Sequence, residues 1–315
     1  CPTPTALTEK PLPHADLEQS QHVDLLETPY ADYEYDAEFQ KKLPCQGGGI
    51  SKPWPIKLNF TCQVDCVLVI LYLWSRQYPI PEARFIGNKS ERMYQTIRMC
   101  NEGKLGVAKA FIWLMNGNSF RNREELDFRE KIEKDWLKGI IGIEITERIS
   151  KCSFEDCNTE DTTHTKYLIE SIEGYSKSLT SLREDFLHWS SENVPCSVCK
   201  IGQRHVDRRL KGDNVSPLLL PIPIDGEDFQ MTECDASLEV MIGRKRYVLH
   251  AFSYAIEKHG TKGVPYLHER CAIWRDNCWM YYDSESWIGG GIFKLKMDKD
   301  RTKPKNYRVA YFRLC

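Results

Sequence analysis

The sequence predicts an α+β protein, in which a mainly helical first part is followed by a strand-rich second part. Two observations carry this prediction. Apolar residues recur at helical spacing over about residues 62–137, and from about Gly139 onward they alternate with a period of two. The chain has 315 residues, of which 41% are hydrophobic and 28% charged, so it has ample material for a large core.

The first 50 residues differ from the rest in charge and composition. Residues 1–40 contain nine acidic residues and one lysine, and prolines at positions 2, 4, 11 and 13 interrupt any regular element. We interpret residues 1–50 as an acidic extension that ends in a flexible joint, Gly47-Gly48-Gly49. The alternative is an arm that docks on the body or on a partner. The chain begins with Cys1 rather than methionine, which suggests a segment of a longer protein.

Composition also narrows the classes of function. Residues 41–315 carry 36 acidic and 42 basic residues, an excess too small to indicate nucleic acid binding. No apolar run reaches the length of a membrane span and no signal-peptide pattern opens the chain, so we expect an intracellular protein, nuclear or cytoplasmic, with no membrane partner. The 13 cysteines are irregularly spaced, which favours metal ligation plus packed core thiols over a disulfide framework.

The individual elements follow from the two periodicities. In the first part we expect helices at the apolar run after Cys62, Glu82–Asn101, Val107–Leu114 and Arg123–Leu137. In the second part we expect strands at Ile141–Cys152, Leu238–Ile242, Tyr247–Ile256, Cys271–Trp274, Trp279–Tyr282, Ile292–Leu295 and Tyr307–Leu314. The three prolines of Val215–Ile224 predict an edge strand or a buried extended segment there. His250 lies in a strand-like run and is expected to be a core histidine.

A cysteine stands where the first helix begins. Cys62 follows a short polar turn, Asn59-Phe60-Thr61, and precedes the apolar run. Unpaired backbone N–H groups and the positive end of the helix dipole would favour a thiolate at this position, which is a common way to make a cysteine nucleophilic. The alternative is an inert thiol buried at the start of a core helix.

Two further pairs of cysteines have the spacing of metal ligands. The first pair is separated by four residues and the second by two, with about forty residues between the pairs: Cys152, Cys157, Cys196 and Cys199. Four thiolates in this pattern match a tetrahedral structural zinc site. Cysteines that merely pack together, or a disulfide in an oxidising compartment, are the alternatives.

The order of these parts resembles the ubiquitin-specific proteases, a family of papain-like cysteine proteases described as thumb, fingers and palm. The resemblance covers roughly residues 51–315 and rests on short motifs in the family's order: Thr61-Cys62, Ile149–Cys152, Val194–Cys199, Tyr247–Ala251, Leu267-His268-Glu269, Trp279–Ser284 and Arg308–Arg313. It implies a papain-like fold with a helical thumb over about residues 51–138, strand-built fingers with a zinc site over about 139–235, and a sheet palm over about 236–315.

The resemblance also implies roles for single residues. Cys62 would be the nucleophile, His268 the base, and Ser284 or Asp283 the residue that orients the imidazole ring. Structural zinc would be the only cofactor, held in the fingers by the four paired cysteines. The family's oxyanion-hole asparagine is replaced by Lys57, and Asn59 is the candidate substitute.

The function implied is a thiol-dependent isopeptidase, which cleaves after the C-terminal glycine of ubiquitin or a ubiquitin-like modifier. The pattern Cys62-x-x-Asp65-Cys66 is similar to a branch of the family that acts on SUMO, so a SUMO isopeptidase is the nearest alternative. Leu267 and Glu269, which replace the usual neighbours of the histidine, favour a third possibility, an inactive domain that serves as a binding scaffold. The expected partners are conjugates of ubiquitin or a SUMO-like modifier, and we expect a monomer.

Overall fold

The structure is a computed structural model of the 315-residue chain. It describes residues 43, 47–50, 55–78, 91–120, 125–130, 136–137, 140, 146–157, 159–165, 191–210, 218–226, 238–242, 245–259, 265–275, 278–284, 291–294 and 307–315. The expected acidic extension therefore lies almost entirely outside the described residues. Within the described part, no helix is both long and apolar enough to cross a membrane.

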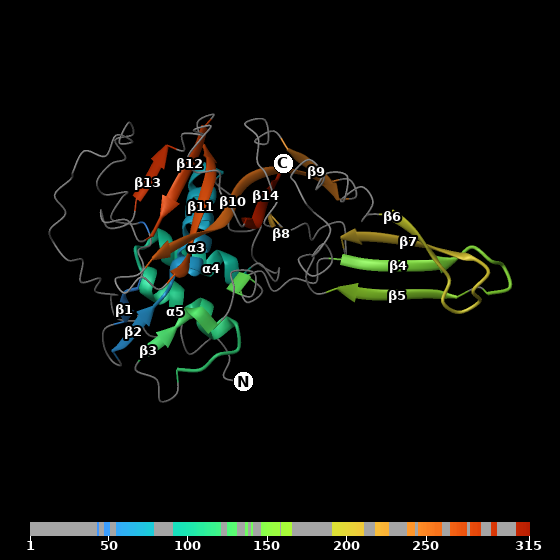
Figure 1. Ribbon diagram of the computed structural model, residues 1–315, viewed down its shortest axis with the longest axis horizontal. Helices are drawn as coiled ribbons and strands as arrows, with labels where there is room; N and C mark the ends of the chain where they lie inside the picture. The colour runs from blue at the N-terminus through green and yellow to red at the C-terminus, as the bar shows by residue number, and fades with distance from the viewer. Residues whose placement is uncertain are drawn as a thin grey trace.

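The described part is a mixed α/β structure, with helices concentrated in the first half and strands in the second, as predicted. Its α-helices are α3 (Cys62–Gln77), α4 (Glu91–Asn101) and α5 (Leu105–Met115). A small sheet has the strand order β1-β2-β3, formed by β1 (Gly49–Ile50), β2 (Ile56–Asn59) and β3 (Glu125–Asp127). In Figure 1 this small sheet lies at the opposite end of the helices from the C-terminal strands.

A seven-stranded antiparallel sheet forms the C-terminal part. Its order is β13-β12-β11-β10-β14-β8, with β9 pairing on β10. The strands are β8 (Leu219–Gly226), β9 (Glu239–Ile242), β10 (Lys245–His259), β11 (Pro265–Arg275), β12 (Cys278–Asp283), β13 (Gly291–Lys294) and β14 (Tyr307–Leu314). The proline-containing strand β8 lies at the sheet edge, as predicted, because proline cannot donate to a second neighbour.

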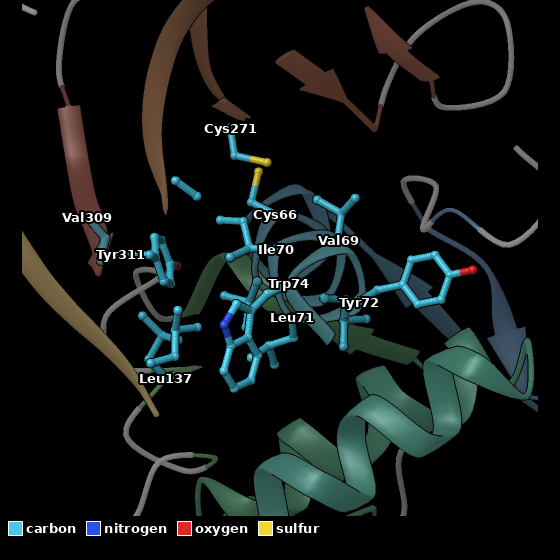
Figure 2. Close-up of a cluster of buried hydrophobic side chains, with 14 of the residues drawn as sticks. Cys66, Val69, Ile70, Leu71, Tyr72, Trp74, Leu137, Cys271, Val309 and Tyr311 are labelled. Carbon is cyan, nitrogen blue, oxygen red and sulfur yellow. The ribbon is translucent and has the colours of Figure 1, made fainter. Parts of the chain in front are cut away.

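The helix that begins at Cys62 is the centre of the core. Almost every residue of α3 from Val64 to Trp74 is fully buried, because the helix lies between the other helices and the large sheet. Figure 2 shows Cys66 facing Cys271 of β11, while Ile70 and Trp74 lie toward Tyr311 of β14. A helix that is apolar on all sides is stable only when both sides are covered, and here they are.

A third sheet is built mainly from exposed residues. Its strands β4 (Thr146–Cys152), β5 (Glu160–Thr165), β6 (Ser191–Pro195) and β7 (Gln203–Leu210) pair antiparallel in the order β5-β4-β7-β6. It extends away from the rest of the molecule as a long arm (Figure 1). Ser150, Cys152 and Val206 are the buried residues among its described strand residues, and Cys196, just after β6, is also buried, so this sheet has little core of its own.

Two expectations about elements are wrong. Arg123–Leu137 is not one helix, since Glu125–Asp127 forms β3 and Phe128–Glu130 a 3-10 turn. Leu126 and Phe128 are buried two residues apart, which suits a strand, and β3 pairs in parallel with β2. The glycine joint is also part of the body: Gly49–Ile50 pairs with β2, and Leu43 lies in the core.

Candidate functional site

The hairpin of β11 and β12 brings His268 and Asp283 together. The two strands pair antiparallel, with Cys271 opposite Tyr282, so the chain returns past the histidine where Asp283 ends β12. His268 Nε2 lies 2.6 Å from Asp283 Oδ1, a short hydrogen bond in which the ring N–H donates to the carboxylate. Both residues are buried, His268 at 1% and Asp283 at 4% exposure. The carboxylate therefore fixes the orientation of the imidazole ring.

Asp283 also has two cationic neighbours. Arg270 Nη2 lies 2.6 Å from Asp283 Oδ2, and Lys258 Nζ lies 3.8 Å from the same oxygen. Arg270 is two residues from His268 on β11, so both side chains stand on the same face of the strand. Asp283 is therefore shared between the imidazole of His268 and two cationic side chains.

Ser284, the other candidate for this role, is placed differently. Its side chain is buried at 3% exposure, and its Oγ has no hydrogen-bond partner among the described residues. Of the two neighbouring candidates, Asp283 is the one in contact with His268.

Cys62 is the first residue of α3 and lies against β11, the strand that carries His268. Its side chain is 8% exposed. The backbone N–H of Glu269 interacts with the Cys62 thiol, which places the sulfur beside the peptide bond that joins His268 to Glu269. The strand that carries the histidine therefore lies against the start of the cysteine helix.

The helix start favours the thiolate of Cys62 as expected, but burial outweighs this effect. Burial raises the pKa of Cys62 to about 12, and the negative charges of Glu269 and Asp65 act in the same direction. The backbone N–H groups of Glu269 and Gln63 lower the pKa, but they do not offset the loss of hydration. A reactive thiolate at Cys62 therefore needs a group that takes its proton.

A fully buried ion pair lies one helical turn after Cys62. Lys109 Nζ of α5 is 2.7 Å from Asp65 Oδ1, and the two side chains are 1% and 0% exposed. Thr61 Oγ1 donates to Asp65 Oδ2 at 2.7 Å and accepts from Lys109 Nζ at 3.1 Å and from the Gly47 N–H at 2.8 Å. Lys109 also donates to the Gly47 carbonyl at 2.9 Å. This network ties the residue before Cys62 to α5 and to the segment that leads into β1.

Burial raises the pKa of Asp65 to about 6, and Lys109 acts against this shift. His268 also acts to lower the pKa of Asp65, as the smallest of the named causes. Sequence analysis missed this network. A lysine inside the apolar run Leu105–Met115 was the available signal, because a lysine is buried in such a helix only when it has an anionic partner.

The candidate oxyanion residue, Asn59, is the last residue of β2 and is half-buried. It pairs with Asp127 in the parallel ladder of β2 and β3. Lys57, on the same strand, is exposed. The role of Asn59 therefore stays a prediction.

His250 is a core residue, as predicted. Its ring is 1% exposed on β10 and contacts the Tyr78 ring edge-on, with the centroids 5.8 Å apart. Burial lowers the pKa of His250 to about 3, so the ring is neutral near pH 7.

The four paired cysteines meet at the tip of the arm. All of their sulfur atoms lie within 4.8 Å of one another, with 3.7 Å between Cys152 and Cys199 and 3.8 Å between Cys157 and Cys196. Four sulfurs at about 2.3 Å from a tetrahedral zinc would be separated by about 3.8 Å. All four cysteines are free, and their separations are far longer than a disulfide bond of about 2.05 Å.

Backbone N–H groups around the cluster point at two of the cysteine sulfurs, as they do around thiolates that bind a metal ion. The N–H of Gly202 donates to Cys199 Sγ at 3.3 Å, and the N–H of Phe154 donates to Cys152 Sγ at 3.5 Å. A side chain at Gly202 would clash, since a Cβ there would lie 2.8 Å from Cys152 Sγ. The donor set and its spacing fit a tetrahedral thiolate-bound metal ion.

No protein-family model and no curated protein sequence matches the chain. Among solved structures, it is similar to the Pan2 pseudoubiquitin hydrolase–RNA exonuclease module of Saccharomyces cerevisiae. With the module bound to AAUUAA RNA, the identity is 10%, the TM-score 0.45, and the match covers 91% of this chain and 56% of that one. With the module bound to AACCAA RNA, the identity is 10%, the TM-score 0.43, and the coverage 97% and 57%.

The same module without RNA gives 9% identity, a TM-score of 0.41, and coverage of 82% and 54%. The chain thus spans just over half the length of these structures.

Proposed function

We propose that the protein is a thiol-dependent isopeptidase that acts on ubiquitin or a ubiquitin-like modifier. The observation that carries the proposal is the hydrogen bond between His268 and Asp283, together with the packing of Cys62 against β11, the strand that carries His268. The three residues come from a helix start and a two-stranded hairpin, and each is held by the core. Their combination is that of a nucleophile, a base and a residue that orients the base.

In this mechanism, His268 accepts the proton of the Cys62 thiol. With Nε2 bonded to Asp283, Nδ1 is the ring atom that exchanges the proton. The thiolate attacks the carbonyl carbon of the modifier's terminal glycine, and the N–H groups at the start of α3 are available to the developing oxyanion. His268 then protonates the departing lysine amine, which leaves a thioester that water hydrolyses with His268 as base.

An inactive binding domain is the second candidate, and a specific observation favours it. Cys62 is only 8% exposed, and burial raises the pKa of its thiol to about 12. The thiol therefore keeps its proton at neutral pH unless His268 accepts it. If the modifier is SUMO and not ubiquitin, the proposed reaction at Cys62 is the same and only the recognised modifier differs.

Reaction with modifier probes tests the proposal. Ubiquitin and SUMO, each carrying an electrophile in place of the C-terminal carboxylate, are incubated separately with the protein. We expect one of them to form a covalent adduct on Cys62, identified by peptide mass spectrometry, and the preferred probe reports the modifier. Cys62→Ala should abolish the adduct, while Cys66→Ala, which changes a buried thiol four residues on, should retain it.

Absence of an adduct with both probes, in a folded protein whose Cys62 is intact, would contradict the enzymatic proposal and favour the scaffold. An adduct that survives Cys62→Ala and disappears in Cys66→Ala would assign the reaction to the other thiol.

We further propose that the four-cysteine cluster holds one structural zinc ion. Four thiolates leave no open coordination position, so the metal would stabilise the arm without taking part in the reaction. The arm has few buried residues of its own, which makes a metal the natural stabiliser of its tip.

Protein purified without chelator is expected to contain one zinc ion per chain by elemental analysis. Cys196→Ser combined with Cys199→Ser should remove the zinc and expose the arm to proteolysis. Cys315→Ser, which changes an exposed thiol outside the cluster, should leave the zinc content unchanged. Metal-free wild-type protein with a protease-resistant arm would rule out the zinc site.

A further inference from the structure

An exposed aromatic residue with an unfavourable backbone conformation lies beside the candidate nucleophile. Phe60 has φ 52°, and the one other non-glycine residue with positive φ in the described part is Lys200. Bulky side chains disfavour this left-handed region, where glycine or asparagine is the ordinary choice. The phenyl group is 39% exposed, so burial does not offset the strain.

The neighbours of Phe60 show that its exposure is imposed by the chain. Thr61, the next residue, is fully buried and hydrogen-bonded to Asp65, and Leu58 is 1% exposed in the core. Residues on either side of this turn are thus held in the core, whereas the Phe60 ring stays exposed. Phe60 stands two positions before Cys62 in the chain, so their Cα atoms lie within about 7 Å of each other.

An arginine is held over the ring. The guanidinium carbon of Arg129 lies 3.7 Å from the centroid of the Phe60 ring. Arg129 is fixed in turn by Asp127, through Nη2 at 2.6 Å, Nε at 3.1 Å and its backbone N–H at 2.9 Å. The adjacent Phe128 is fully buried against Trp113 and Trp136, which anchors the arginine's backbone.

These side chains form a surface that is held by several contacts and still remains exposed. Arg129 is 64% exposed although Asp127 and the ring restrict its rotamers, so ordering it costs conformational entropy with little burial in return. A cation stacked on an aromatic ring can add stability, but the gain is small for a pair on the surface. Such a pair could also form without placing an aromatic residue in the left-handed backbone conformation. Strained and ordered residues next to a reactive group are typical of sites that contact a substrate.

We propose that Phe60 and Arg129 form the substrate-contacting surface on one side of Cys62 and help to determine which acyl tail the site accepts. The ring face not covered by Arg129 would pack on the extended, glycine-containing tail next to the scissile carbonyl. Glycine residues have no side chain to hold a peptide away from an aromatic face, so their peptide planes can approach it closely. This inference rests on the proposed isopeptidase function.

Phe60→Asn provides the test, because asparagine tolerates the left-handed conformation while removing the aromatic surface. The specificity constant for the preferred modifier probe is expected to fall roughly tenfold or more. The melting temperature should stay the same or rise. Alkylation of Cys62 by iodoacetamide, which has no peptide tail, should change less than about twofold.

Two further variants complete the test. Phe60→Tyr keeps the aromatic face and is expected to retain the wild-type rate. Met241→Asn removes a comparably exposed apolar side chain, 47% exposed on β9, and should leave the rate unchanged. If Phe60→Asn reacts with the probe at the wild-type rate, or loses iodoacetamide reactivity to the same extent as probe reactivity, the surface has no role in recognising the tail. Failure of wild-type protein to react with either probe would instead contradict the isopeptidase proposal itself.

Discussion

Replacing Lys109 with methionine is expected to lower the free energy of unfolding by about 3–5 kcal/mol. The side chain of Lys109 is 1% exposed and its ammonium group is 2.7 Å from the carboxylate of Asp65, which is fully buried. Methionine has a similar length but no charge, so the change leaves a buried carboxylate without its cation. The loss should appear as a lower urea midpoint at an unchanged slope.

The effect of Lys109→Met should depend on pH in a definite direction. Burial already raises the pKa of Asp65 from 3.8 to about 6, and without Lys109 the folded-state pKa rises further. A carboxyl group whose pKa is higher in the folded state than in the unfolded state destabilises the fold at high pH. This penalty shrinks as the pH falls below the folded-state pKa and is gone below the unfolded-state pKa. We therefore expect the stability lost by Lys109→Met to be larger at pH 8 than at pH 5.

A double variant provides the control. Asp65→Leu together with Lys109→Met removes both charges and should recover most of the lost stability, because a buried pair can often be replaced by apolar residues without loss. If Lys109→Met alone costs less than about 1 kcal/mol at pH 8, the buried ion pair is not formed in solution.

The strands of the second half were predictable because each carries its own period. The expected strand at Tyr307–Leu314 has those same bounds as β14, and Trp279–Tyr282 lies within β12. The segment around Leu126 was not predictable in this way. Buried residues at 126 and 128 fit a strand, but the apolar spacing of the surrounding sequence fits a helix equally well. The segment is a strand because it pairs with β2, which lies more than sixty residues earlier in the chain.

The candidate site was predictable in its residue types but not in its contacts. Spacing pointed to the four cysteines at the arm tip, and the resemblance to the ubiquitin-specific proteases pointed to His268 with Asp283 or Ser284. The choice between Asp283 and Ser284 depends on which way each side chain points after β12, and the sequence does not contain that information. The pKa of Cys62 depends mainly on how deeply the thiol is buried, and the residues around the helix start do not reveal that depth.

The second large effect concerns the activation of Cys62. A thiol with a pKa of about 12 is almost entirely protonated at pH 7, so its alkylation rate should keep rising with pH far into the alkaline range. If His268 accepts the proton, a thiolate–imidazolium pair forms instead, and the rate should be high already near neutral pH. His268→Ala is therefore expected to slow alkylation of Cys62 at pH 7 by roughly 100-fold or more.

The residue that orients the ring can be identified in the same way. Asp283→Asn removes the negative charge beside the imidazole, and we expect the rate of Cys62 alkylation at pH 7 to fall by about tenfold. The expected effect is modest because Arg270 and Lys258 also interact with that carboxylate. Ser284→Ala is the matched control on the neighbouring residue and should react within about twofold of wild type, since its Oγ makes no hydrogen bond among the described residues.

The pH dependence of Cys62 alkylation tests the central claim most directly. The rate is measured from pH 5 to 10 by mass spectrometry of the Cys62 peptide, with the exposed Cys315 of the same chain as an internal reference thiol. The account predicts a wild-type rate at Cys62 that reaches a plateau near neutral pH, and a rate in His268→Ala that is low at pH 7 and still rising at pH 10. Superimposable profiles for wild type and His268→Ala would contradict it, because His268 would then not take the proton of Cys62.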